Sequence, residues 1–204
     1  MISEIRLYCE GGGDGRATQE KLRDGLREFL KSLRDEARQK KIRFEVMACG
    51  SRNETFDKFK TARRTHTTAF NVLLVDAEEP LAQPPWRHLR ERDGWNLQAA
   101  DERHCHLMVQ TTEAWIVADV EALKHFYQKG FNAKAIPKNP DVERINKAEL
   151  ARALKNATRR TNKGEYHKTR HTPELLKKIA PAKVRKAARH CDRLFDTLTE
   201  EMSA

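Results

Sequence analysis

The chain is predicted to fold as a three-layer α/β sandwich around a mostly parallel central sheet. Three strand-like segments alternate with two helical segments in its first 76 residues, in the order strand, helix, strand, helix, strand. Residues 71–76 form a short, continuous apolar run that ends in Asp76, which is typical of a strand buried on both faces of a parallel sheet. This alternation favours helices packed on both sides of the sheet.

Each early element has its own signal. Residues 4–9 alternate polar and apolar side chains and run into a glycine-rich turn, which predicts the first strand. Apolar residues recur at helical spacing over residues 17–40, so a single long helix is expected there. A second strand is predicted over residues 43–49, and Phe56, Phe59 and Ala62 indicate a helix over residues 53–66.

The later elements are less regular. Residues 79–103 contain several prolines and many charges, which predicts a long loop over the sheet edge. A fourth strand is expected over residues 106–110, followed by a helix that begins near Glu113. Further helices are expected over residues 120–128 and 147–158, at a start marked by Thr172-Pro173, and as a last apolar-striped helix from Val184 to Leu198. We therefore expect a catalytic α/β core over residues 1–130 and a basic helical region over residues 131–204 that packs on it.

Composition narrows the class of protein. The sequence lacks an 18-residue apolar run, and its four cysteines show no CxxC spacing. A cytoplasmic protein with reduced thiols is therefore expected. The net charge is +10, and residues 134–193 hold 18 Lys or Arg against 6 Asp or Glu. Such a local excess attracts polyanions such as DNA or RNA, although a solvated helical face is the simpler alternative.

Acidic residues follow two of the predicted strands. Glu10 comes directly after the first strand, and Asp76 and Glu78 end the third. Ligands of open α/β sheets bind outside the carboxyl ends of the strands, where these side chains are expected to converge. Asp76 and Glu78 are two residues apart, so in extended geometry they point the same way. Hard oxygen ligands of this kind select Mg²⁺ or Mn²⁺, while solvated strand ends are the alternative for any one acid.

A glycine-rich segment, Gly11-Gly12-Gly13-Asp14-Gly15, follows the first acid. It could cradle a phosphate at the start of the next helix. It is not a Walker A loop, because no Lys-Ser/Thr follows, and it lacks the GxGxxG pattern of dinucleotide folds. Its glycines also fit close approach of the backbone to a ligand or to a neighbouring strand. Asp14 is interpreted either as an acid behind the metal ligands or as a helix cap.

Basic and aromatic residues gather between Lys163 and His171. Here Tyr166 could stack on a base, His167 or His171 could donate a proton to a scissile phosphate, and Lys168 could stabilise charge on the phosphoryl oxygens. A solvated loop is the alternative. The residues expected to contact nucleic acid are Arg159, Arg160, Lys163, Tyr166, Lys168, Arg170 and His171.

Two of these motifs resemble a known fold family. The segment Tyr8-Cys9-Glu10-Gly11-Gly12-Gly13-Asp14-Gly15 resembles the first TOPRIM motif, and Leu74-Val75-Asp76-Ala77-Glu78 resembles the Asp-x-Asp motif with Glu in its second position. Nearly end to end, through residues 110–119 and 163–171 as well, the chain also resembles the DUF4276 group of bacterial proteins.

The TOPRIM resemblance implies a metal-dependent nuclease related to the overcoming-lysogenisation-defect type. It implies that Glu10 is the general acid or base and that Asp76 and Glu78 hold Mg²⁺ or Mn²⁺. Glu113 matches an acid near a Trp in related defence nucleases and would be a further ligand. An ABC-type ATPase partner and a role in anti-phage defence are implied as well. The alternative is a non-catalytic module that binds nucleic acid or regulates an ATPase. The sequence leaves open whether the chain forms homo-oligomers.

Overall fold

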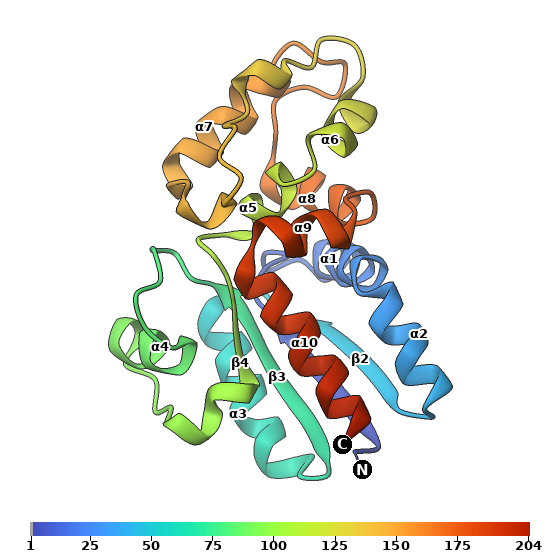
Figure 1. The fold of residues 1–204 in the computed structure, drawn as a ribbon, viewed down its shortest axis with the longest axis vertical. Helices are drawn as coiled ribbons and strands as arrows, with labels where there is room; N and C mark the ends of the chain where they lie inside the picture. The colour runs from blue at the N-terminus through green and yellow to red at the C-terminus, as the bar shows by residue number, and fades with distance from the viewer. Residues whose placement is uncertain (1) are drawn as a thin grey trace.

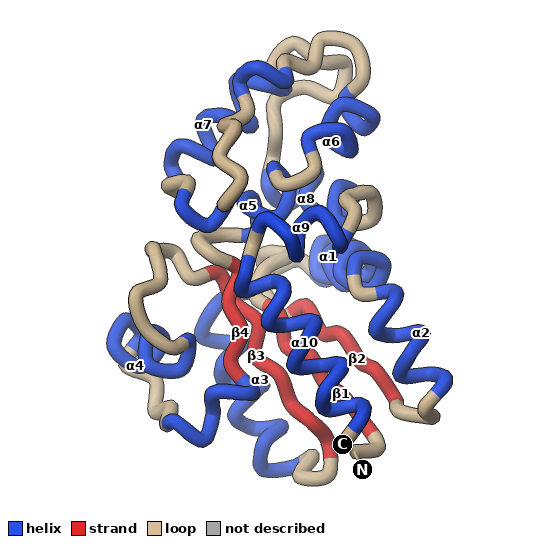
Figure 2. The backbone as a smooth tube through the Cα atoms, viewed as in Figure 1, coloured by secondary structure: helices blue, strands red, loops and turns tan. Residues whose placement is uncertain are grey.

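The centre of the molecule is a four-stranded sheet in which all strands run parallel. The computed structural model describes residues 2–204, and its strand order is β2-β1-β3-β4. The strands are β1 (Glu4–Cys9), β2 (Arg43–Ala48), β3 (Ala69–Asp76) and β4 (Cys105–Met108) (Figure 2). The predicted α/β class with a mostly parallel sheet is confirmed, and the arrangement is consistent with a TOPRIM-like sandwich.

Helices cover both faces of this sheet. Leu7, Val72 and Leu74 face one apolar cluster, while the alternate residues Leu73 and Val75 face another, as the two-residue period of a strand requires. The first cluster packs under α1 (Arg16–Phe29), α2 (Lys31–Gln39) and α10 (Arg189–Ser203). The second packs under α3 (Arg52–Thr65) and α4 (Pro85–Asp93). Figure 1 shows α10 lying along the sheet beside α2.

A helical lobe, defined here as residues 112–167, extends beyond the carboxyl ends of the strands (Figure 1). The chain enters it directly from β4 and returns through α8 (Lys168–Leu176) and α9 (Pro181–Ala187). The first apolar cluster continues from the sheet into this lobe without a break. The elements of the lobe are α5 (Thr112–Val117), α6 (Val120–Tyr127), η2 (Ala133–Ala135), η3 (Val142–Arg144) and α7 (Lys147–Thr158).

Two predicted helices and one predicted loop need correction here. The helix expected over residues 17–40 is interrupted at Leu30, and the last apolar stripe is divided between α9 and α10 at Ala188, whose backbone is extended. The region expected to be a loop contains α4 and a short 3₁₀ helix, η1 (Ala99–His104). There Pro85 occupies the first turn, where proline is tolerated, and Gly94 ends the helix in the left-handed conformation.

A buried histidine joins α10 to the sheet. His106 on β4 is fully buried, and its Nε2 lies 3.1 Å from the carbonyl oxygen of Arg103. Arg193 of α10 donates to His106 Nδ1 at 3.2 Å and to the Cys105 carbonyl at 2.9 Å. Burial, followed by the charge of Arg193, lowers the pKa of His106 to about 3. The imidazole is therefore neutral in the folded protein at all ordinary pH values.

This neutral histidine predicts loss of stability in acid. The unfolded chain takes up a proton at His106 near the ordinary histidine pKa, whereas the folded chain does not, so stability is complete above that pH and falls below it. At about pH 4.5 the loss should be roughly 2 to 3 kcal/mol. Urea unfolding of His106→Gln should show a correspondingly shallower pH dependence. Exposed His125→Gln is the control, and an equal acid loss in His106→Gln would contradict the prediction.

Candidate active site

A cavity of about 220 Å³ opens at the carboxyl edge of the sheet. The residues that follow β1 and β3 line it, as does the first residue of α8, so segments distant in sequence meet there. This is the edge at which parallel α/β sheets bind ligands. The polar and glycine residues of its lining include Glu10, Gly11, Gly12, Gly13, Gly50, Asp76, Glu78, Thr112 and Lys168.

Asp76 lines this cavity and is only 4% exposed. Its Oδ1 accepts hydrogen bonds from the backbone N–H of Thr112 at 2.8 Å and from the Thr112 hydroxyl at 2.9 Å. Its Oδ2 accepts one from Lys168 Nζ at 2.8 Å. Burial raises the pKa of Asp76, and the attraction of Lys168 only partly opposes this because the charge of Glu113 adds to it. The neighbouring ammonium of Lys168 therefore helps to keep Asp76 charged.

Glu10 follows β1 and lies beside Asp76, which ends the neighbouring strand β3. Its Oε2 accepts hydrogen bonds from Arg52 Nη1 at 2.9 Å and from the backbone N–H of Asp76 at 3.3 Å. Burial and the charge of Asp76 raise the pKa of Glu10, against the opposing effect of Arg52. Glu10 and Asp76 thus repel each other, as the predicted convergence of strand ends requires.

Arg52 is a site residue that the sequence reasoning missed. Its guanidinium donates to both carboxylate oxygens of Asp93, at 2.9 and 2.8 Å, and to the backbone carbonyl of Asp76. It therefore ties α4 to the acids, and its side chain is only 15% exposed. Its position was a usable signal, because it follows the carboxyl end of β2 at the same edge of the sheet as Glu10.

Lys168 connects two acids. Its ammonium nitrogen lies 2.8 Å from Asp76 Oδ2 and 3.5 Å from Glu113 Oε2, while the hydroxyl of Tyr166 donates to Glu113 Oε1 at 3.1 Å. Partial burial alone would lower the pKa of Lys168, but the charges of Asp76 and Glu113 outweigh it and raise the pKa. The side chain is half exposed, so it approaches these two acids from the solvent side of the site.

Close packing holds Lys168 in place. The sequence predicted a helix starting at Thr172-Pro173, but α8 begins at Lys168 and contains Pro173. It lies so close to α1 that a Cβ on Gly25 would stand 2.5 Å from the Pro173 carbonyl oxygen. Gly25 thereby permits the approach that carries Lys168 to the sheet edge.

Glu78 lines the cavity but is turned away from the extended direction. Its φ is +67°, so the expectation that Asp76 and Glu78 point the same way along one strand is wrong, because β3 ends at Asp76. Glu78 Oε2 accepts a hydrogen bond from Lys147 Nζ at 2.7 Å. Burial would raise the pKa of Glu78, but the hydrogen bond and charge of Lys147 prevail and lower it. Glu78 is therefore the acid least dependent on a further cation.

The glycine segment forms one wall of the cavity. Gly11, Gly12 and Gly13 have φ values of +116°, +87° and +62°, which side chains rarely adopt. Gly11 exchanges two backbone hydrogen bonds with Gly50 at 2.8 and 3.1 Å, so the glycines allow close approach of a neighbouring segment. Asp14 is exposed, does not line the cavity and does not cap α1, whose N-cap is Gly15.

Two residues expected to contact nucleic acid are instead buried. Tyr166 is 7% exposed and its hydroxyl lies 2.7 Å from that of Thr172, while His171 is 4% exposed and lies 2.9 Å from the Tyr127 hydroxyl. The predictions that they stack on a base or reach a phosphate are wrong for this arrangement, because both support the helices behind the site. His167 is exposed but does not line the acidic cavity. The other exposed members of the predicted set are Arg159, Arg160, Lys163 and Arg170.

The carboxylates of the cavity suit a divalent ion in their chemistry but not in their present positions. Within residues 2–204, no group of three or more His, Cys, Asp or Glu stands close enough to hold an ion as the side chains lie. Each acid already forms a salt bridge with a basic side chain: Glu10 with Arg52, Glu78 with Lys147, and Asp76 with Lys168. The donor chemistry nevertheless suits Mg²⁺ or Mn²⁺, since buried, mutually repelling carboxylates share one cavity. Movement of the Lys168 ammonium would open the place between Asp76 and Glu113.

Comparison with known proteins identifies a family without an assigned activity. No curated protein and no solved structure matches the chain. In the described structure no helix is long and apolar enough to cross a membrane. The model of a domain of unknown function, DUF4276, matches residues 9–199, which include every acid of the cavity. The match spans most of the sequence, and the chain therefore belongs to the DUF4276 family.

Proposed function

We propose that this protein is a Mg²⁺- or Mn²⁺-dependent nuclease that hydrolyses phosphodiester bonds of nucleic acid. The observation that carries the proposal is the meeting of Glu10, Asp76 and Glu78 in one cavity at the sheet edge, where the Lys168 ammonium joins Asp76 to the buried Glu113. Buried acids that repel one another lower stability unless a cation is bound, so their accumulation favours a metal-dependent function over a purely structural one.

Each side chain then has a role. Asp76, Glu113 and Glu10 would hold the ion, which when bound supplies a Lewis acid and a more acidic water. Thr112 fixes the orientation of Asp76, and Arg52 fixes that of Glu10. Burial raises the pKa of Glu10, so this carboxylate is suited to accept and return a proton during attack on a phosphate. Lys168, once released from Asp76, would stabilise charge on the phosphoryl oxygens.

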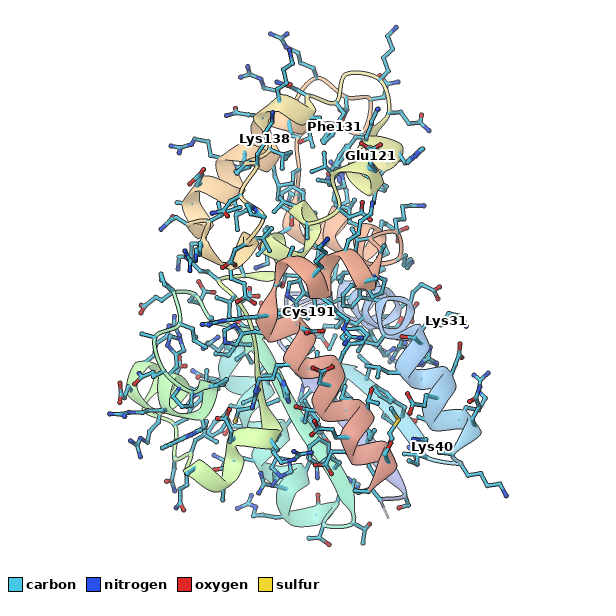
Figure 3. All side chains as sticks on the ribbon, viewed as in Figure 1. Lys31, Lys40, Glu121, Phe131, Lys138 and Cys191 are labelled. Carbon is cyan, nitrogen blue, oxygen red and sulfur yellow. The ribbon has the colours of Figure 1, made fainter. Side chains whose placement is uncertain are left out.

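The charge of the helical lobe supports a polyanionic substrate. The lobe carries exposed lysines and arginines on α7 and in the neighbouring segments. Figure 3 shows one of them, Lys138, at the end of the molecule far from the termini. The carboxyl ends of the strands open toward this lobe (Figure 1). A nucleic acid held there would reach the acids through its backbone, which is the usual contact that positions a strand without reading its sequence.

A cleavage assay tests the proposal. Labelled single-stranded and double-stranded DNA and RNA are incubated with the purified chain in Mg²⁺, in Mn²⁺ and in EDTA. We expect products with either ion and none in EDTA. Salt-sensitive binding without products, unchanged by EDTA, would contradict the enzyme and support the non-catalytic module instead. The ATPase partner and the role in anti-phage defence stay predictions from the resemblance.

A further inference from the structure

A second cavity, of about 310 Å³, lies beside the acidic one at the end of β4. Gln110 lines it and connects the two cavities. The Gln110 carbonyl accepts a hydrogen bond from the backbone N–H of Glu78 at 2.7 Å, and Glu78 lines the acidic cavity. Gln110 Oε1 lies 3.3 Å from the backbone nitrogen of Lys147, whose ammonium binds Glu78. The two cavities are therefore neighbours, separated by the contact between Gln110 and Glu78.

The buried pair Glu143 and His190 forms one wall of this second cavity. Glu143 is 6% exposed, and its carboxylate accepts from the His190 backbone N–H at 2.8 Å and from Nδ1 at 2.7 Å. This contact fixes the ring, leaving Nε2 of His190 as the nitrogen without a hydrogen-bond partner in residues 2–204. The hydrogen bond from the His190 backbone N–H to Glu143 satisfies the first turn of α10, but this structural role does not involve Nε2 of the ring.

Gln110 supplies a second polar group to the wall of this cavity. Its side chain is only 2% exposed, and its Oε1 lies 3.3 Å from the backbone nitrogen of Lys147. Its amide group lines the cavity and is a donor of the kind that buried sites use to hold a ligand. Gln110 and His190 thus present two preset polar groups to one cavity.

Arginines add charge at the same cavity. The Arg189 side chain is 74% exposed and lies 3.6 Å from Glu143, while the Arg144 side chain is 80% exposed and lies 3.1 Å from Asp141. Both guanidinium groups are largely exposed, so an anion can reach them although each lies beside a carboxylate. The Gln110 amide and the two guanidinium groups are donors that fit the oxygens of a phosphate.

We propose that this second cavity binds a backbone phosphate of the substrate next to the phosphate that is cleaved. The inference rests on the proposed nuclease function, since it assigns the neighbouring cavity to the same nucleic-acid strand. Gln110 would orient the phosphate, Arg189 would supply charge, and the ring of His190 would shape the wall beside them. The site would thereby set the register of the strand across Glu10 and Asp76, so that residues of the second cavity are positioning residues.

The experiment measures binding without cleavage. Fluorescence anisotropy of short single-stranded DNA and RNA is recorded in EDTA for wild type, Arg189→Gln, His190→Gln and the control Arg38→Gln, an exposed arginine of α2 that lines neither cavity. Each oligonucleotide is also made with one phosphate at a time replaced by a neutral methylphosphonate. Arg189→Gln should weaken binding roughly fivefold to tenfold and reduce the salt slope by about 1. Arg38→Gln should change the affinity less than about twofold.

The position of the lost phosphate decides the outcome. If the proposal holds, one methylphosphonate weakens wild type and Arg38→Gln but has no further effect in Arg189→Gln, because the contact is already absent. Equal losses at every position, or wild-type binding by both Arg189→Gln and His190→Gln, would overturn it. If one methylphosphonate loses its effect in Arg189→Gln but no variant cleaves in Mg²⁺, the phosphate site stands and the nuclease function is refuted. If the protein cleaves but no methylphosphonate depends on Arg189, the nuclease function stands and the phosphate site is refuted.

Discussion

Asp76→Asn should abolish metal-dependent cleavage while leaving the fold intact. The substitution keeps the shape of the side chain and an oxygen that can accept from Thr112 at the 2.8 Å and 2.9 Å positions. It removes the charge that would hold the ion and that now binds Lys168. Loss of a central ligand and its electrostatic effect should lower the cleavage rate by about a thousandfold or more.

The matching measurements separate chemistry from folding. Single-turnover cleavage in Mn²⁺ gives the rate, and urea unfolding gives the stability of the same variant. Because burial raises the pKa of Asp76, removing its charge should leave stability within about 1 kcal/mol of wild type. Asp24→Asn, a half-exposed acid of α1 outside the cavity, is the control and should cleave normally. Wild-type cleavage by Asp76→Asn would remove the basis of the proposed function.

The acids could be predicted because their signal is local. Glu10 and Asp76 each end a strand with a clear apolar pattern, and parallel strands place such ends at one edge whatever the rest of the chain does. Lys168 was chosen for its charge, and the structure brings it to Asp76 through the packing of α8 on Gly25. That packing joins segments far apart in sequence, so no local period could have shown which lysine reaches the site.

The errors have the same physical origin. Tyr166 and His171 lie in a basic stretch whose composition is typical of a surface, yet both are buried against neighbouring helices. Burial of a polar ring depends on partners such as Thr172 and Tyr127, which satisfy its hydrogen bonds. Arg52 was missed because its partners, Glu10 and Asp93, come from opposite sides of α3 in the sequence. Composition predicts that a segment binds something, whereas tertiary contacts decide which side chains remain free to do so.

Lys168→Met should bind Mn²⁺ more tightly than wild type and yet cleave far more slowly. The ammonium of Lys168 lies 2.8 Å from Asp76 and 3.5 Å from Glu113, so it competes with an ion for the same oxygens. Without this competitor, Mn²⁺ affinity measured by calorimetry should rise about tenfold, which corresponds to about 1.4 kcal/mol. Cleavage should fall by about a hundredfold, because the charge that would stabilise the phosphoryl oxygens is lost.

A closely matched lysine provides the control for this prediction. Lys183 lies 2.6 Å from Asp119, and the side chains of this pair are 51% and 4% exposed, compared with 50% and 5% for Lys168 and Asp76. Lys183→Met therefore removes an equivalent ion pair away from the cavity and should change neither Mn²⁺ affinity nor cleavage. Unchanged Mn²⁺ binding in Lys168→Met would show that the ammonium does not occupy the metal's place. Faster cleavage would instead assign Lys168 an inhibitory role, because an ion pair that only blocked the acids would release activity when removed.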